Sequence, residues 1–412
     1  LMSDFESFYL DNGLHVIIHE DPTVQTAVIN LLYDVGSKDE DPELTGFAHL
    51  FEHLMFGGSK NIVNFDEELQ KAGGENNAFT SPDVTNYYMT LPPQNLETGF
   101  WLESDRMLSL SFDPKALEVQ RNVVIEEFKQ RYLNQPYGDL WLKLRPLAYK
   151  QHPYQWATIG KEISHIEKVT IDDVKSFFYK HYAPDNACLV VAGNVKKDEV
   201  LKLSEKWFGP ILASNRPKRY LPVEGIQKER RETSLSGDVP QSSITMVFPM
   251  PGKFDADYYA SDLVSDVLGR DKSSRLHTKL VRDEKLFNTI NAYVTGSNDP
   301  GLLVISGKVS QGTDSKVAEK GINEVIQSVL SGIKEEELEK VKNQAESALI
   351  FSNMEVLNRA MRLAMASLSG DVNLVNKEVE KINSVTLHGI NLQAKTILDP
   401  SKANVLYYHS QN

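Results

Sequence analysis

The most informative stretch of this chain is Gly46-Phe47-Ala48-His49-Leu50-Phe51-Glu52-His53-Leu54-Met55-Phe56. Its apolar residues recur at helical spacing, which predicts a helix with Thr45 as N-cap and Gly57-Gly58 as the C-terminal stop. Because His49 and His53 are four residues apart, both imidazoles lie on one face of that helix and can reach one metal ion. Glu52 lies beside them, close enough to act on a metal-bound water. The stretch therefore predicts a zinc site.

A catalytic zinc ion needs a third protein ligand and one open position for water. Glu126 and Glu127, within the long helical stretch 114–133, are the best candidates for that ligand. Adjacent residues on a helix point about 100° apart, so only one of the two carboxylates can face the histidines. A buried structural cluster is the alternative to a metal site, but burying two imidazoles and a carboxylate without a shared partner is costly.

Composition narrows the class of protein. The 412 residues suffice for two or three domains, and the formal net charge of −13 argues against nucleic acid or an anionic membrane as partner. The single cysteine, Cys188, excludes an intrachain disulfide, and its apolar neighbours predict a buried thiol on a strand.

The apolar runs are far shorter than the about 20 residues of a membrane span. The first residues lack a secretory signal, so we expect a cytoplasmic protein, with an already removed signal as the alternative.

Strand and helix patterns occur twice, in the same order. In the first half, strands are predicted at 14–18, 25–33, 77–80, 86–91 and 187–192, and helices at 96–110, 114–133 and 171–182. In the second half, strands are predicted at 242–248 and near Asn291 and Leu302, and helices at 258–268 and from Asp314 onward. Strands grouped with runs of helices, instead of strict alternation, indicate an α+β fold.

A short repeat supports duplication of the chain. Asn77-Ala78-Phe79 and Asn291-Ala292-Tyr293 are 214 residues apart, and each precedes a second strand. The same offset sets Leu263, Asp266 and Val267 against His49, Glu52 and His53. We therefore expect two homologous domains, 1–215 and 229–412, joined by a charged linker at 216–228, with metal ligands in the first domain only.

The motif from His49 to His53 resembles the signature of the inverted-motif zinc peptidases, the pitrilysin or mitochondrial-processing-peptidase family M16. Further segments match the family in the expected order along nearly the whole chain. They are Asn12-Gly13-Leu14, Gly73-Gly74, Asn77 to Thr80, Thr85-Asn86-Tyr87, Arg121 to Glu127, His152-Pro153-Tyr154, Tyr182 to Asn186, Leu268-Gly269, Ser273 to Leu276 and Asp299-Pro300-Gly301.

The resemblance implies a LuxS/MPP-like metallohydrolase fold, in which each domain is an antiparallel sheet packed with helices. It implies that His49 and His53 bind Zn²⁺ and that Glu127, preferred over Glu126 by the family register, is the third ligand. Glu52 is then the general base, which takes a proton from the metal-bound water that attacks a peptide carbonyl.

The resemblance also implies a substrate-binding strand. Asn77, Ala78 and Phe79 would form an edge strand that holds an extended peptide through main-chain hydrogen bonds. The implied function is a zinc-dependent endopeptidase acting on peptides or unfolded protein segments. Two alternatives stay open: a non-catalytic scaffold or accessory subunit of the same fold, and a zinc hydrolase acting on a small thioether or ester.

Two positions depart from the family pattern. Gln120 stands seven residues before Glu127, where the family commonly has an acid. Members that act alone carry an Arg and, seven residues on, a Tyr in the second domain, and the matching positions here are Leu303 and Ser310. The chain then resembles the catalytic subunit of the short, two-chain members. We therefore expect a clamshell formed with a second related subunit or a second copy of this chain.

Overall fold

The computed structural model describes residues 3–412 and divides them into two compact units. Unit 1 comprises the chain up to Phe128, Trp156–Leu221 and Ile350–Lys377, and unit 2 comprises Lys129–Gln155, Pro222–Leu349 and Glu378–Asn412. Each unit thus takes one segment from the other half of the sequence. The contiguous domains expected at 1–215 and 229–412 do not include this exchange, because helical spacing identifies a helix without saying which sheet it covers.

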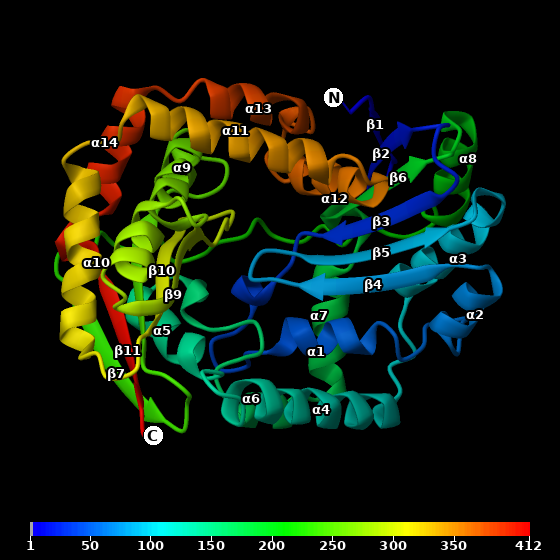
Figure 1. Ribbon diagram of the computed structural model, residues 1–412. Coiled ribbons are helices and arrows are strands. Elements are labelled where there is room, and N and C mark those ends of the chain that lie inside the picture. Colours follow the sequence, from blue (N-terminus) through cyan, green and yellow to red (C-terminus); the bar gives the residue numbers. More distant parts are fainter. Residues whose placement is uncertain (1–2) are drawn as a thin grey trace. The chain divides into compact units, whose positions relative to one another are not determined.

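Unit 1 is built on a six-stranded sheet in the order β1-β2-β6-β3-β5-β4 (Figure 1). Its strands are β1 (Glu6–Tyr9), β2 (His15–Glu20), β3 (Ala27–Tyr33), β4 (Glu75–Thr80), β5 (Thr85–Leu91) and β6 (Ala187–Gly193). β2 and β6 are parallel, and every other neighbouring pair is antiparallel. The sheet is therefore mixed, where a purely antiparallel one was expected.

The helices of unit 1 come from all three of its segments. They are α1 (Phe47–Leu54), α2 (Phe65–Lys71), α3 (Leu96–Leu108), α4 (Pro114–Phe128), α6 (Ile163–Glu167), α7 (Ile171–His181), α8 (Lys197–Trp207) and α12 (Val356–Ser367). The helix expected at 114–133 ends as an α-helix at Phe128 and continues as a π-helix over Lys129–Leu133.

The sheet of unit 1 has helices on both faces. Val28 and Leu32 of β3 belong to a buried cluster with Leu363 of α12. Ile29, between them, faces the other way, and a Cβ added to Gly99 of α3 would lie 2.5 Å from its Cδ1. The glycine thus lets α3 approach the sheet closely, and the sheet is the middle of three layers.

Unit 2 has a five-stranded sheet in the order β7-β11-β8-β10-β9. Its strands are β7 (Arg231–Gly237), β8 (Ser243–Met250), β9 (Phe287–Val294), β10 (Gly301–Val309) and β11 (Asn404–Ser410). The remaining α-helices are α5 (Leu140–Ala148), α9 (Tyr258–Gly269), α10 (Ser315–Leu330), α11 (Glu335–Ser352), α13 (Leu374–Asn383) and α14 (Leu387–Ile397), of which α11 and α13 each cross a boundary between the units.

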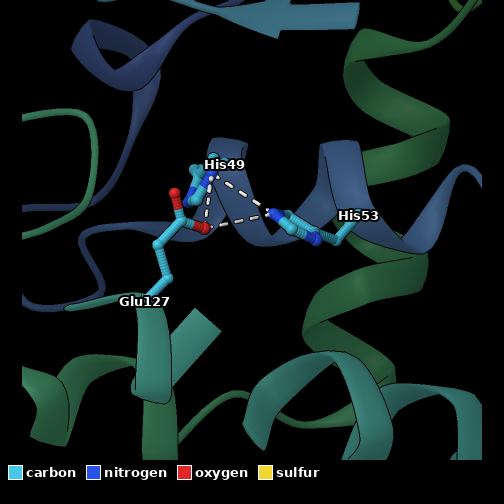
Figure 2. A group of neighbouring side chains, drawn as sticks. All are labelled: His49, His53 and Glu127. Carbon is cyan, nitrogen blue, oxygen red and sulfur yellow. Dashed lines mark hydrogen bonds and ion pairs between the residues drawn. The ribbon is translucent and has the colours of Figure 1, made fainter. Parts of the chain in front are cut away.

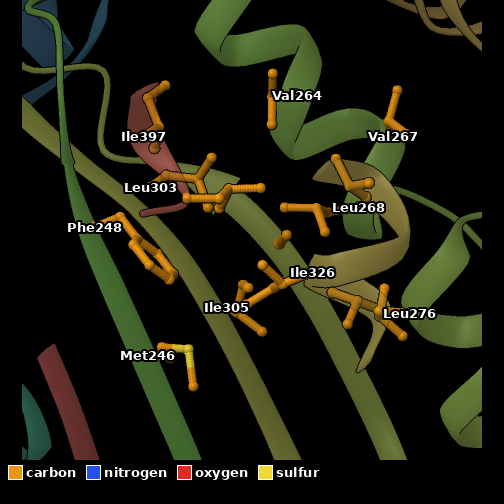
Figure 3. Close-up of a cluster of buried hydrophobic side chains, with 14 of the residues drawn as sticks. Met246, Phe248, Val264, Val267, Leu268, Leu276, Leu303, Ile305, Ile326 and Ile397 are labelled. Atoms are coloured by element: carbon orange, nitrogen blue, oxygen red, sulfur yellow. The ribbon is translucent and has the colours of Figure 1, made fainter. Parts of the chain in front are cut away.

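The topology of unit 2 repeats that of unit 1. The order β7-β11-β8-β10-β9 corresponds to β2-β6-β3-β5-β4, and β7 and β11 form the one parallel pair, as β2 and β6 do. Helix α9 follows β8 as α1 follows β3. Figure 3 shows Val264, Val267 and Leu268 of α9 in the apolar core of unit 2, which also contains Phe248 and Leu303.

Two further findings concern single features of the chain. Cys188 is buried in β6, and burial raises the pKa of its thiol to about 12, so the predicted buried strand thiol is confirmed. None of the helices formed by residues 3–412 combines the length and the apolar character that a bilayer crossing requires.

Candidate metal centre

Helix α1 separates apolar and polar side chains. Leu50 and Phe51 are fully buried, and the ring of Phe51 stacks on that of Tyr182 with centroids 4.2 Å apart. His49 and His53 lie on the less buried side of the helix. Aromatic packing therefore fixes the helix, and its histidines remain accessible.

The start of α1 differs from the sequence prediction. Gly46 is the N-cap, in a left-handed conformation with φ 83°, and the helix begins at Phe47. The hydroxyl of the expected cap, Thr45, contacts His165 Nδ1 at 2.8 Å and accepts a hydrogen bond from the Lys161 N–H at 2.8 Å. Thr45 was the wrong N-cap because its side chain is engaged by a segment more than a hundred residues later.

Helix α4 supplies Glu127 beside α1. The guanidinium of Arg121, on the same helix, donates hydrogen bonds to the carbonyl oxygens of Ile166, Glu167 and Val169 at 2.6, 2.9 and 2.6 Å. These bonds fix α4 to the segment around α6, and α4 also packs against α1. The carboxyl group at the end of α4 is thereby held in place.

His49, His53 and Glu127 converge on one point (Figure 2). The two Nε2 atoms are 3.3 Å apart, and each lies 3.6 Å from Glu127 Oε2. Ligand atoms about 2.0–2.1 Å from a tetrahedral zinc ion are about 3.3 Å from one another. The three side chains are 15 to 25% exposed, so a fourth position is open to solvent. The residues present fit a zinc ion.

Glu52 is next to this group, and Thr80, for which the sequence predicted no role, orients its carboxyl group. Thr80, the last residue of β4, donates a hydrogen bond from Oγ1 to Glu52 Oε2. Burial raises the pKa of the Glu52 carboxyl above its usual value, whereas the bond from Thr80 lowers it. The contact joins residues 28 positions apart and depends on the packing of α1 against β4, so only the fold reveals it.

Strand β4 is an edge of the sheet, as the sequence predicted for Asn77, Ala78 and Phe79. In antiparallel pairing with β5, Ala78 lies opposite Tyr87. Asn77 and Phe79 are exposed, whereas Ala78 is half-buried on the same face as Thr80. Among the strands of residues 3–412, none pairs with the other side of β4, and β4 ends at Thr80, which contacts Glu52.

Comparison with protein families assigns both halves of the chain. Residues 15–159 match the family described as "Insulinase (Peptidase family M16)", and residues 168–345 match "Peptidase M16 inactive domain". The chain belongs to peptidase family M16. The part of this M16 chain that matches the inactive domain includes α9, where the offset of 214 residues sets Leu263 and Val267 against His49 and His53.

Curated relatives of this M16 chain are named zinc proteases. "Zinc protease PqqE" of Helicobacter pylori is 29% identical over 85% of this chain and 80% of its own length. "Uncharacterized zinc protease YmxG" of Bacillus subtilis is 27% identical over 97% of both chains.

Solved structures share the fold. A protease from Helicobacter pylori superposes with a TM-score of 0.92 at 26% identity, covering 99% of this chain and all of that one. The periplasmic protease PqqL from Escherichia coli gives a TM-score of 0.81 at 19% identity, which shows the fold alone, and only 48% of that chain is covered.

The cytoplasmic location expected for this M16 chain stays a prediction.

Glu127 is the carboxylate that the fold brings to the histidines. Among residues 3–412, the one group of three or more potential ligands close enough to hold an ion consists of His49, His53 and Glu127, without Glu126. Gln120 lies half-buried on α4, two helical turns before Glu127 and on the same face. The geometric choice between the two adjacent acids thus agrees with the family register.

The structure places the two positions expected to match the family's Arg and Tyr in and directly after β10, and the match itself stays a prediction. Leu303 is fully buried in the core of unit 2, and the hydroxyl of Ser310 contacts Asn288 at 3.2 Å just beyond β10. An Arg at position 303 would lie within that core and would contact no substrate.

Proposed function

We propose that this chain is a zinc-dependent endopeptidase that hydrolyses peptides or unfolded protein segments. The observation that carries the proposal is the spacing of 3.3 to 3.6 Å among His49 Nε2, His53 Nε2 and Glu127 Oε2. Relatives that cover nearly the same length are named zinc proteases, which supports the same class of reaction.

His49, His53 and Glu127 would hold the zinc ion. A zinc ion bound there lowers the pKa of water toward about 7 and polarises a carbonyl oxygen. Glu52 takes the proton from the attacking water and gives it to the leaving amine. Thr80 orients the Glu52 carboxylate for both transfers through its hydrogen bond.

Strand β4 would hold the substrate. An extended peptide can add to the side of β4 that has no neighbouring strand, with main-chain hydrogen bonds to Asn77, Ala78 and Phe79. Because folded proteins offer few extended, unpaired segments, this mode selects peptides and unfolded chains.

The zinc content per chain tests the metal site directly. We expect about one zinc ion per chain in the wild-type protein and in His388→Ala, which changes an exposed histidine of α14. His53→Ala should lose the ion. Absence of zinc from all three proteins after incubation with the metal would contradict the proposal and favour the non-catalytic scaffold.

Turnover distinguishes an enzyme from a metal-binding scaffold. Glu52→Gln should retain zinc and lose hydrolysis of a fluorogenic peptide library, because the amide cannot accept the proton. Zinc-loaded wild-type protein that cleaves small esters but no peptide would favour the hydrolase alternative.

A further inference from the structure

The first turn of α1 has no cap from its own N-cap residue. Gly46 has no side chain, and a Cβ there would lie 2.5 Å from the carbonyl oxygen of Ile159. The hydroxyl of Thr45 is engaged by His165 and Lys161. The N–H groups at the start of a helix nevertheless need acceptors when they are buried.

Glu40 supplies the acceptors from outside the helix. Its Oε2 accepts a hydrogen bond from the Ala48 N–H at 2.7 Å, and its Oε1 accepts one from the Gly46 N–H at 3.2 Å. The Trp156 Nε1–H donates to Oε1 as well, at 3.0 Å. Glu40 is only 7% exposed, so a buried carboxylate caps the helix one residue before His49.

The position of Glu40 is itself fixed by its surroundings. Trp156 Nε1 also donates to the carbonyl oxygen of Ser37 at 3.0 Å, which ties the turn Ser37–Asp39 to the same indole. The guanidinium of Arg219 donates to both carboxylate oxygens of Asp39, at 2.6 and 2.9 Å. The cap is therefore held from the segment before α1 and from the segment that begins at Trp156.

Burial raises the pKa of Glu40 to about 8, although hydrogen bonds from Gly46, Phe47, Ala48 and Trp156 lower it. The contribution of Glu40 to α1 is geometric, because its two oxygens hold the N–H groups of Gly46 and Ala48 at the start of the helix.

We propose that Glu40 is a positioning residue for the metal centre, which fixes the first turn of α1 and thereby the direction of the His49 and Glu52 side chains. This inference rests on the proposed zinc site. It adds a residue from outside both the metal-binding motif and the third-ligand helix.

Glu40→Gln tests the inference with almost no change of shape. Both carboxylate oxygens accept N–H groups, so the amide NH₂ of glutamine must face at least one donor, that of Ala48 in the better orientation. Substitution of a residue that orients metal ligands typically lowers metal affinity 10–100-fold. We expect zinc affinity, measured by competition with a chromogenic chelator, to fall about tenfold or more, and the absorption spectrum of the cobalt(II) form to change.

Two further variants separate positioning from general loss of structure. Asn64→Ala removes the side-chain cap of α2, a helix of the same unit without metal ligands, and should leave zinc affinity unchanged. Trp156→Phe removes one donor to Glu40 and should lower affinity less than Glu40→Gln does. The melting temperature of metal-free Glu40→Gln should stay within a few degrees of wild type, because one unpaired N–H group costs only about 1–3 kcal/mol.

Failure of this inference can be told apart from failure of the proposed zinc site. A wild-type protein that binds no zinc would remove the metal site and this inference together. A wild-type protein that binds zinc, with Glu40→Gln equal to it in affinity and cobalt spectrum, would overturn the inference alone. An equal loss of affinity in Asn64→Ala would also overturn it, because any weakening of unit 1 would then suffice.

Discussion

At the scale of single residues, Glu126 and Glu127 form a matched pair for testing the third ligand. Both are on α4, but only Glu127 is grouped with the histidines. We expect Glu127→Gln to lower zinc affinity by more than about 100-fold, which exceeds the usual effect of substituting a residue that only orients the ligands. Glu126→Gln should stay near the wild-type affinity in the same titration, and a larger loss for Glu126→Gln would mean that the register of α4 is misassigned.

Thr80 offers a second residue-scale prediction. Thr80→Val keeps the shape of the side chain but removes the hydroxyl that contacts Glu52. We expect kcat to fall about 10–100-fold with zinc content unchanged, because the general base loses its orientation. Thr80→Ser, which keeps the donor, should recover most of the rate. A valine variant with wild-type kcat would leave Thr80 without a role in positioning Glu52.

His181 should make stability depend on pH. It is buried, and Arg216 donates to its Nδ1 at 2.7 Å; burial and the nearby cations lower its pKa from 6.5 to about 3. Between these two values the unfolded chain binds a proton that the folded chain does not, so stability is lost as the pH falls through this window. The slope contributed by one such group approaches about 1.4 kcal/mol per pH unit.

The measurement is urea unfolding of wild type and His181→Gln at pH 7 and pH 5. The glutamine keeps an acceptor for Arg216 but does not titrate, so its loss of stability between the two pH values should be smaller. Equal losses in both proteins would show that other groups determine the acid sensitivity.

At the scale of elements, α12 is a required part of unit 1. Leu363 of α12 is fully buried against a cluster that includes Val28 and Leu32 of β3. We expect Leu363→Ala to destabilise the protein by about 2–5 kcal/mol, the usual effect of a Leu to Ala cavity. Leu392→Ala, on the exposed side of α14, should change stability by less than about 0.5 kcal/mol in the same denaturant titration. Equal effects would contradict the packing of α12 on the sheet.

The sequence predicted those elements whose evidence is local. Spacing of four residues was enough to place His49 and His53 on one face, and alternating or apolar runs located the strands. Glu127 needed the family register, because spacing alone could not choose between adjacent acids. Thr80 and Glu40 act through contacts to helix α1 that side-chain packing and loop paths decide, so no pattern along the chain identified them.

At the scale of the whole molecule, the family resemblance leads us to expect a second subunit, either related or identical. If the partner is a second copy, sedimentation should show a dimer, and peptidase activity per chain should rise with protein concentration until the dimer is filled. If it is a related chain, activity should appear only on mixing. Full turnover by a strictly monomeric preparation would contradict both forms of the expectation.

Each half of the sequence contributes one segment to the unit that the other half mainly forms. Leu144 of α5, from the first half of the sequence, packs with Val304 and Leu406 on the sheet of unit 2. Helix α12, from the second half, covers the sheet of unit 1. Neither half of the sequence therefore contains all the helices that its own sheet needs, which explains why a linear boundary could not describe the units.

This exchange sets an order of events during synthesis. The strands and metal-binding helix of unit 1 leave the ribosome before α12, the helix that covers one face of their sheet, which is encoded only at Val356–Ser367. A nascent chain therefore exposes one apolar face of this sheet until α12 has been made, and products truncated before Val356 keep it exposed. The metal-binding unit becomes complete only after its last segment, Ile350–Lys377, has been made.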